Sequence, residues 1–208
     1  MKQNFCVKYS GKSRKEIKQE FISEINILLH RYYGVNSDKK ICKRVNQELA
    51  TILKTNLFLD IAVLQEVCDW IHKSGYSYWL SGTTSSSFIL YLLGIANINP
   101  LPAHSICPKC HSIIWHNNIK DGFDLPTDVC SCIKDNDTME VDGHDISWEN
   151  LLMFDDKTPN LQIRIPYLLK DQLLEHLEQN WLISLDNKVS LTFPYKNKIG
   201  RASCRERV

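Results

Sequence analysis

The chain has 208 residues, of which 43% are hydrophobic, and its 25 basic side chains nearly balance 24 acidic ones. This length supports one globular domain, or one domain with a small satellite, and can bury a sizeable core. The composition excludes collagen-like, low-complexity and fully disordered proteins, and the near-neutral charge argues against a protein that coats nucleic acid with its whole surface.

The first third of the chain is predicted to be helical. Apolar residues recur at helical spacing in three stretches, which are residues 13–33, 38–54 and 57–73. Gly34 and Gly75 are suited to end the first and third helices, and Ser37 is suited to cap the second. These patterns predict amphipathic helices that pack on another part of the molecule.

The rest of the chain is predicted to mix strands and helices. The expected elements are a strand at 76–80, a hydroxyl-rich turn at 81–87, a buried helix at 88–94, a loop-rich segment at 104–142, a short helix at 146–154, a strand at 161–165, a helix at 167–180, and a hairpin at 181–193. The hairpin is expected to turn at Asp186-Asn187-Lys188. Together these elements indicate an α+β fold.

The N-terminal composition and the cysteine content predict a compartment. Residues 1–18 are polar and lysine-rich, without the apolar stretch of a signal peptide. The longest mostly apolar run, 88–98, is shorter than the roughly 20 residues that span a bilayer. We therefore expect a cytoplasmic protein without membrane contact, in which cysteines bind metal or remain buried thiols rather than form disulfides.

The last ten residues, 199–208, have no apolar period and resemble the translation of a common sequencing-adapter oligonucleotide. The alternative is a basic C-terminal tail. Without these residues the net charge changes from +1 to −1, and seven of the eight cysteines remain. A reading frame that runs into adapter has no natural stop, which leaves open whether the natural chain extends beyond Lys198.

Four cysteines in the loop-rich segment have the spacing of a zinc site. Cys107 and Cys110 have the form of a knuckle, and Cys130 and Cys132 are one residue closer than is usual. Zinc takes four soft ligands in a tetrahedron, often as two close pairs, and four thiolates leave no open position for water, so the role would be structural. The alternative, four reduced cysteines in a loop, is disfavoured because so small a segment rarely folds without a disulfide or a bound metal ion. The nearby substitutes, should one thiol not reach, are His104, His111 and His116.

The hydroxyl-rich turn at 81–87 is a second candidate site. It leads into the buried helix at 88–94, and the N–H groups and dipole at a helix start favour an anion such as phosphate. The turn contains no Lys or Arg, however, and a polar cap on a buried helix explains these residues about as well. Both interpretations stay open from the residues alone.

The turn and the cysteines occur in one order with specific spacers, and this combination resembles bacterial DNA polymerase III of the PolC type. The resemblance covers roughly Arg44 to Pro159, is weak before that, and is absent after about Pro166. The motifs that carry it are Ser81–Phe88, Gly94-Ile95, Asn99–His104, Cys107-Pro108-Lys109-Cys110, Gly122–Pro126, Cys130 with Cys132, Asp142–Ile146, Phe154 and Pro159.

The resemblance implies a nucleotidyltransferase-like palm that carries a structural zinc. Its implied triphosphate contacts are Gly82, Thr83, Ser86 and Ser87, and its implied zinc ligands are Cys107, Cys110, Cys130 and Cys132. The implied partners are DNA, a nucleoside triphosphate and replisome proteins, in replication in the bacterial cytoplasm. The implied organisation is a helical region at 1–75, a palm-like fragment at 76–166 with the zinc insertion at 104–142, a helix plus hairpin at 167–198, and the adapter-like tail at 199–208.

Departures from the family bear on catalysis. Ser81 stands where the family has an arginine, and the two metal-binding aspartates of the family fall on Asn160 and Gln162. Neutral amides lack the charge that holds two magnesium ions, and the nearby, adjacent Asp155 and Asp156 would point to opposite faces of a strand. We expect no DNA synthesis by this chain alone, with magnesium needed only if activity is retained. The alternative is a non-catalytic, zinc-bearing module that binds DNA or a replisome protein.

Two further groups of polar residues have simpler explanations. His144 is a catalytic candidate, but a buried hydrogen bond explains it better. The basic residues of the N-terminal region are expected to form a solvated face rather than a DNA-binding patch, although a weak DNA contact there is testable. These residues are Lys12, Arg14, Lys15, Lys39, Lys40, Lys43 and Arg44.

Overall fold

The structure is a computed structural model that describes residues 2–9, 13–119, 124–132, 138–148 and 161–192, of which 2–9, 81–83 and 178–192 are described by their backbone alone. The adapter-like tail at 199–208 lies outside these ranges, as do Asn160, Asp155 and Asp156. The helix expected at 146–154 also lies mostly outside them, and its described residues, 146–148, are not helical.

Three helices form the N-terminal part of the molecule, as the apolar spacing predicts. They are α1 (Arg14–Tyr33), α2 (Lys39–Lys54) and α3 (Phe58–Lys73). Gly34 follows α1 with a φ of 75°. The cap of α2 differs from the prediction, because Asp38 accepts the bond from the Lys40 N–H at 2.7 Å, while the Ser37 hydroxyl donates to the Gly34 carbonyl.

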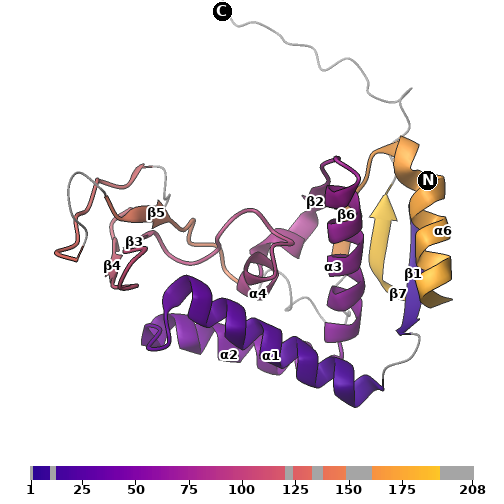
Figure 1. Ribbon diagram of the computed structural model, residues 1–208, viewed down its shortest axis with the longest axis horizontal. Helices are drawn as coiled ribbons and strands as arrows, with labels where there is room; N and C mark the ends of the chain where they lie inside the picture. Colours follow the sequence, from indigo (N-terminus) through magenta and orange to yellow (C-terminus); the bar gives the residue numbers. More distant parts are fainter. Residues whose placement is uncertain (1, 10–12, 120–123, 133–137, 149–160, 193–208) are drawn as a thin grey trace, which may run out of the picture.

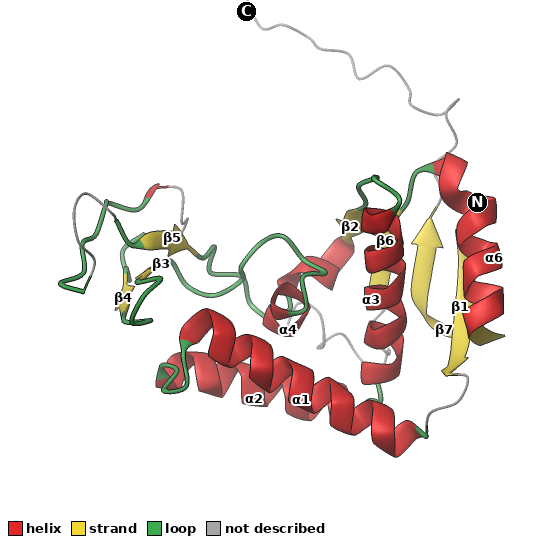
Figure 2. Ribbon diagram, viewed as in Figure 1, coloured by secondary structure: helices red, strands yellow, loops and turns green. Residues whose placement is uncertain are grey.

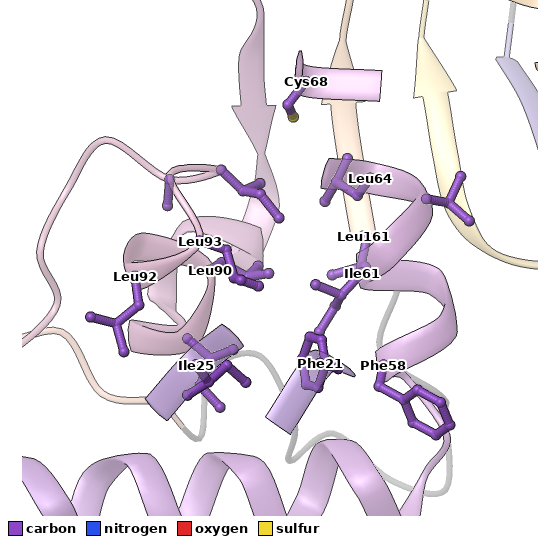
Figure 3. Close-up of a cluster of buried hydrophobic side chains, with 14 of the residues drawn as sticks. Phe21, Ile25, Phe58, Ile61, Leu64, Cys68, Leu90, Leu92, Leu93 and Leu161 are labelled. Atoms are coloured by element: carbon purple, nitrogen blue, oxygen red, sulfur yellow. The ribbon is translucent and has the colours of Figure 1, made fainter. Parts of the chain in front are cut away.

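The hydrophobic core lies where α1 and α3 meet the short helix α4 (Phe88–Leu92) and the strand β6 (Leu161–Arg164). Figure 3 shows side chains from all four elements in this cluster. They include Phe21 and Ile25 of α1, Phe58, Ile61 and Leu64 of α3, Leu90 of α4, and Leu161 of β6, all of them buried. The core therefore joins the helical region directly to the sheet.

The larger sheet combines strands from distant parts of the chain. It contains β1 (Lys2–Tyr9), β2 (Trp79–Ser81), β6 and β7 (Trp181–Thr192), in the order β1-β7-β6-β2 within the described residues. β6 and β7 are parallel, and the other pairs are antiparallel. Parallel neighbours need a crossover, which here consists of the 3₁₀ helix η3 (Tyr167–Leu169) and the helix α6 (Lys170–Asn180). α3 contacts three strands of this sheet (Figure 1).

Two parts of this sheet differ from the sequence prediction. The predicted hairpin at 181–193 is instead the single strand β7, and the predicted turn residues fall within it. The adjacent residues Phe5 and Cys6 of β1 pair with Val189 and Ser184. Residues 185–188 of β7 therefore lie between the two segments of this strand that pair with β1. The turn-like composition therefore marks an irregularity of the pairing. β1 itself was not predicted.

A second, smaller sheet carries the cysteine segment. It consists of β3 (His104–Ile106), β4 (Ile113–Trp115) and β5 (Glu140–Asp142), all antiparallel, with β3 in the centre. Figure 2 shows it at the end of the molecule opposite the larger sheet. In the described part of the chain, no helix combines the length and the apolar character needed to cross a membrane.

The last residue of β5 and the glycine that follows it connect the small sheet to the rest of the fold. The Asp142 carboxylate accepts hydrogen bonds from the Tyr91 hydroxyl at 2.9 Å and from the Asn99 amide at 2.8 Å. Burial, followed by the charge of Asp142, raises the pKa of Tyr91 above its usual range. The chain then passes so close to the backbone of Pro102 that a Cβ on Gly143 would lie 2.4 Å from the Pro102 carbonyl oxygen.

Replacing Gly143 by alanine is therefore expected to destabilise the protein more than a matched change at Gly75. Both glycines have a positive φ, 99° and 75°, which costs about 1–2 kcal/mol with a side chain. Only Gly143 also faces backbone atoms, which adds about 1–3 kcal/mol of overpacking, whereas a Cβ at Gly75 meets nothing within 4 Å. Urea unfolding of both variants measures the difference, and equal losses would contradict this interpretation.

Candidate functional site

The four cysteines singled out in the sequence come together at one end of the small sheet. The sulfur atoms of Cys107, Cys110, Cys130 and Cys132 all lie within 4.8 Å of one another. Individual sulfur–sulfur distances are 3.2 Å for Cys107 and Cys132, 3.6 Å for Cys110 and Cys130, and 3.4 Å for Cys130 and Cys132. Zinc–sulfur bonds of about 2.3 Å give a tetrahedron with edges of about 3.8 Å. The donor set and its spacing therefore fit a tetrahedral metal ion.

The end of β3 and the turn that follows it position two of these sulfur atoms. Cys107 directly follows β3 and is buried, and its sulfur accepts the Cys110 N–H at 3.4 Å, as a knuckle requires. The hydrogen bond with Ser112 lowers the pKa of Cys110 to about 6, whereas the hydrogen bond with Cys107 raises the pKa of Cys132 to about 12. A bound divalent metal would displace the remaining protons, because it takes thiolates as ligands.

The three histidines considered as substitute ligands have other partners. The His104 ring bonds the Pro102 carbonyl through Nδ1 at 2.8 Å, and the His111 ring bonds the Tyr32 carbonyl at 3.1 Å. His116 Nε2 lies 2.8 Å from Asp128, whose carboxylate also accepts the Ser105 hydroxyl at 2.6 Å. The cluster that could hold a metal among the described residues thus consists of the four cysteines alone.

The second candidate site, the turn at 81–87, is a 3₁₀ helix, η1 (Gly82–Ser86), between β2 and α4. This is the predicted order of strand, turn and buried helix. Thr84, Ser86 and Ser87 are buried. The Ser87 hydroxyl caps α4 by accepting the Leu90 N–H at 3.3 Å.

A carboxylate from α2 occupies the start of α4. Glu48 is fully buried and accepts the Ser87 hydroxyl at 2.7 Å, the Phe88 N–H at 3.0 Å and the Ile89 N–H at 3.1 Å. Arg44, one turn earlier on α2, pairs with Glu48 at 2.5 Å. An anion therefore does lie at this helix start, as the dipole favours, but the protein supplies it.

Arg44 also connects three segments of the fold. Its guanidinium donates to the Ser86 carbonyl at 3.0 Å and to the Ile146 carbonyl at 3.1 Å. The side chain is mostly buried, so the expectation that Arg44 belongs to a solvated basic face is wrong, because its partners are internal. Sequence reasoning missed Glu48 altogether. The sequence signal that could have identified Glu48 is its helical spacing, because it lies on the same face of α2 as the buried Ile41, Val45 and Ile52.

The backbone of Gln162, a residue that the resemblance places at a family aspartate position, lies next to η1. It is on β6 opposite Ser81, and its backbone N–H donates to the Thr84 hydroxyl oxygen at 3.0 Å. The structure thus places the backbone of Gln162 beside the candidate phosphate turn. His144 is half-buried, and its backbone N–H donates to the Asn99 carbonyl at 3.1 Å, while the role of its side chain stays a prediction.

Comparisons with known proteins identify a family that this chain resembles. A family model described as the bacterial DNA polymerase III alpha NTPase domain matches residues 17–181. A DNA polymerase III PolC-type from Lacticaseibacillus paracasei is 30% identical over 151 residues, which cover 71% of this chain and 10% of that protein. One from Streptococcus thermophilus is 34% identical over 149 residues, covering 70% and 10%. One from Mycoplasma genitalium is 29% identical over 150 residues, covering 72% and 10%.

The family-model match extends on both sides of the stretch that carries the sequence motifs, so the expectation that the resemblance is absent after about Pro166 is wrong. The chain spans about a tenth of the length of the curated relatives that it matches. The family model begins in α1 and reaches the first residue of β7. By this match, the chain belongs to the bacterial DNA polymerase III alpha family and is PolC-like.

Proposed function

We propose that this chain is a nucleotide- and DNA-binding part of a PolC-like polymerase core that does not catalyse phosphoryl transfer by itself. The observation that supports the lack of catalysis most is Gln162, whose backbone lies beside η1 and whose neutral amide stands where the resemblance implies a metal-binding aspartate. Two-metal catalysis needs carboxylates that hold both ions against the reacting oxygens. In the family such a protein acts in replication, in the bacterial cytoplasm, together with replisome proteins.

The proposed triphosphate contacts are Gly82, Thr83, Ser86 and Ser87. The first two lie at the start of η1, on the side of β2 and Gln162. Ser87 already donates its hydroxyl proton to Glu48, so we expect the backbone around Gly82 and Thr83 to make the main phosphate contacts. Magnesium would accompany the nucleotide, bound to the phosphate oxygens rather than held by a dedicated protein cage.

The proposed metal of the cysteine cluster is zinc, in a structural role. Four thiolates fill a tetrahedral coordination sphere and select zinc over harder cations such as magnesium. A bound zinc would hold the end of β3 to the 130–132 loop, which is otherwise attached by few backbone hydrogen bonds among the described residues. Chemistry at this ion is not expected, since no position is open to water.

We expect no template-directed primer extension from this chain with magnesium and all four deoxynucleotides. A more direct test is titration with Mn²⁺, followed by electron paramagnetic resonance. The wild-type chain is expected to bind no Mn²⁺ at η1, and the double variant Asn160→Asp with Gln162→Asp is expected to gain a site, because it restores the two carboxylates that the resemblance implies for metal binding. The control variant, Asn46→Asp with Gln172→Asp, adds the same charge at exposed positions. Primer extension by the wild type, or equal Mn²⁺ binding by both variants, would contradict the proposal.

A second candidate function is a zinc-bearing paralogue that only binds DNA or a replisome protein. The observation in its favour is that all four cysteines gather in one cluster while an aspartate position is neutral. It differs from the first candidate in requiring no nucleotide at η1. Binding of a deoxynucleoside triphosphate, measured by calorimetry, favours the first, and DNA binding without nucleotide binding favours the second.

A further inference from the structure

A groove separate from η1 and from the cysteine cluster lies between α2 and the small sheet. It encloses about 470 Å³ and is lined by Lys40, Lys43, Gln47, Trp115 and Trp148, together with Arg44, Leu101, Pro102, Asp145, Ile146 and Ser147. This volume is within the range of about 300–1,000 Å³ that is typical of ligand sites. Figure 1 shows β4, which ends at Trp115, close to the end of α2 that carries Lys40.

The walls of the groove are fixed by hydrogen bonds rather than formed by loose loops. The Arg44 guanidinium ties α2 to the Ile146 carbonyl, and the Asp145 and Ile146 N–H groups donate to the carbonyls of Leu101 and Pro100 at 2.9 and 3.0 Å. Arg44 itself is neutralised by Glu48. Among the described residues that line the groove, the remaining charges are then the two exposed lysines, Lys40 and Lys43, and the carboxylate of Asp145.

Aromatic rings lie next to these lysines. The Lys40 ammonium sits 4.9 Å from the centre of the Trp115 ring, and Trp148 lines the same groove and is half-buried. An ammonium over an indole face marks a place that attracts either a cation or a stacked base. The flexible stem of Lys40 allows the ammonium to leave the ring and reach a phosphate.

From these features we propose that the groove binds single-stranded nucleic acid, with bases stacked on the tryptophan rings and phosphates paired with Lys40 and Lys43. Aromatic rings that lie beside lysines recognise unpaired bases joined by phosphates, whereas bases within a duplex are already stacked on each other. The inference builds on the proposed function only in assuming that nucleic acid is the partner. It requires neither a nucleotide at η1 nor a metal.

Binding is measured by the fluorescence anisotropy of a labelled 12-residue oligothymidine at several salt concentrations. The double variant Lys40→Ala with Lys43→Ala is expected to reduce the slope of log K against log salt by about 1.4, since each lost phosphate contact accounts for about 0.7 with a single strand. The matched control, Lys15→Ala with Lys18→Ala, removes the same charge from exposed residues in the first turns of α1 and is expected to leave the slope unchanged. Equal effects of the two pairs would overturn the proposal.

Stacking is tested separately at Trp148. Trp148→Ala is expected to weaken binding about 5- to 150-fold, and Trp148→Phe, which keeps an aromatic face, is expected to retain most of the affinity. Equal losses in both variants, tighter binding of a 12-base-pair duplex, equal competition by poly-glutamate, or no binding at low salt would each overturn the proposal. Failure of the Mn²⁺ test at Gln162 would leave these results unaffected, so the two proposals fail independently.

Discussion

Replacing Glu48 by alanine is expected to reduce the free energy of unfolding by about 3–5 kcal/mol. The carboxylate is fully buried and has four partners, which are the Arg44 guanidinium, the Ser87 hydroxyl and the N–H groups of Phe88 and Ile89. The substitution leaves a mostly buried arginine without its counter-charge and leaves two helix N–H groups without an acceptor. Each of these losses is among the more costly single changes in a protein interior.

Urea unfolding followed by circular dichroism measures this loss. Glu20→Ala, which removes an exposed carboxylate from α1, serves as the control and is expected to change stability by less than about 0.5 kcal/mol. The double variant Arg44→Met with Glu48→Ala separates the two causes. We expect it to be more stable than Glu48→Ala alone, because it removes the stranded charge. A Glu48→Ala variant as stable as the control would show that this carboxylate does not stabilise the start of α4.

Removing the metal, or one of its ligands, is expected to unfold the small sheet while α1–α3 stay folded. Its strands have three residues each, and a sheet this small is marginal without a staple. A metal that binds only the folded form contributes about 4 kcal/mol when its free concentration is about a thousand times its Kd. Cys107→Ser is the strongest variant, because this sulfur is buried and contacts that of Cys132.

Elemental analysis and hydrogen exchange test this together. The wild type is expected to carry about one zinc per chain, and Cys107→Ser less than half an equivalent. Exchange of the amides of β3 is expected to accelerate in the variant and after treatment with a chelator. Cys42→Ser is the matched control, since this thiol lies on α2 outside the cluster. Unchanged protection of β3 without metal would rule out a structural role for the site.

Features that depend on nearby residues could be predicted from the sequence. The helices α1, α2 and α3 could be predicted from the spacing of their apolar residues, because each helix buries mainly one face. The grouping of the four cysteines follows from two close pairs, even though the second pair has an uncommon spacing. That zinc is the metal, and that η1 binds phosphate, stay predictions.

Features that depend on which distant segments meet could not be predicted. Glu48 and Arg44 have the spacing of an ordinary exposed pair one helical turn apart. The apolar neighbours of Glu48 on α2 indicate the buried face of the helix, but the partners of its carboxylate follow only from the approach of α4 to α2. The polar residues at 186–188 have the composition of a turn, yet they lie within β7 because β1 pairs on both sides of them. The Lys40–Trp115 contact joins α2 to β4, and no pattern among neighbouring residues of the sequence indicates it.

The pairing of β1 with β7 has a consequence for the order of folding. Lys2 pairs with Thr192 and Tyr9 with Trp181, so the two strands that meet come from opposite ends of the described chain. Closing so long a loop is slow compared with forming helices whose contacts are local. During synthesis, α1–α3 can therefore assemble early, whereas β1 has no strand to pair with, among the described residues, until β7 has left the ribosome. The larger sheet is then the last part to form, and its first strand is the segment exposed longest to incorrect pairing.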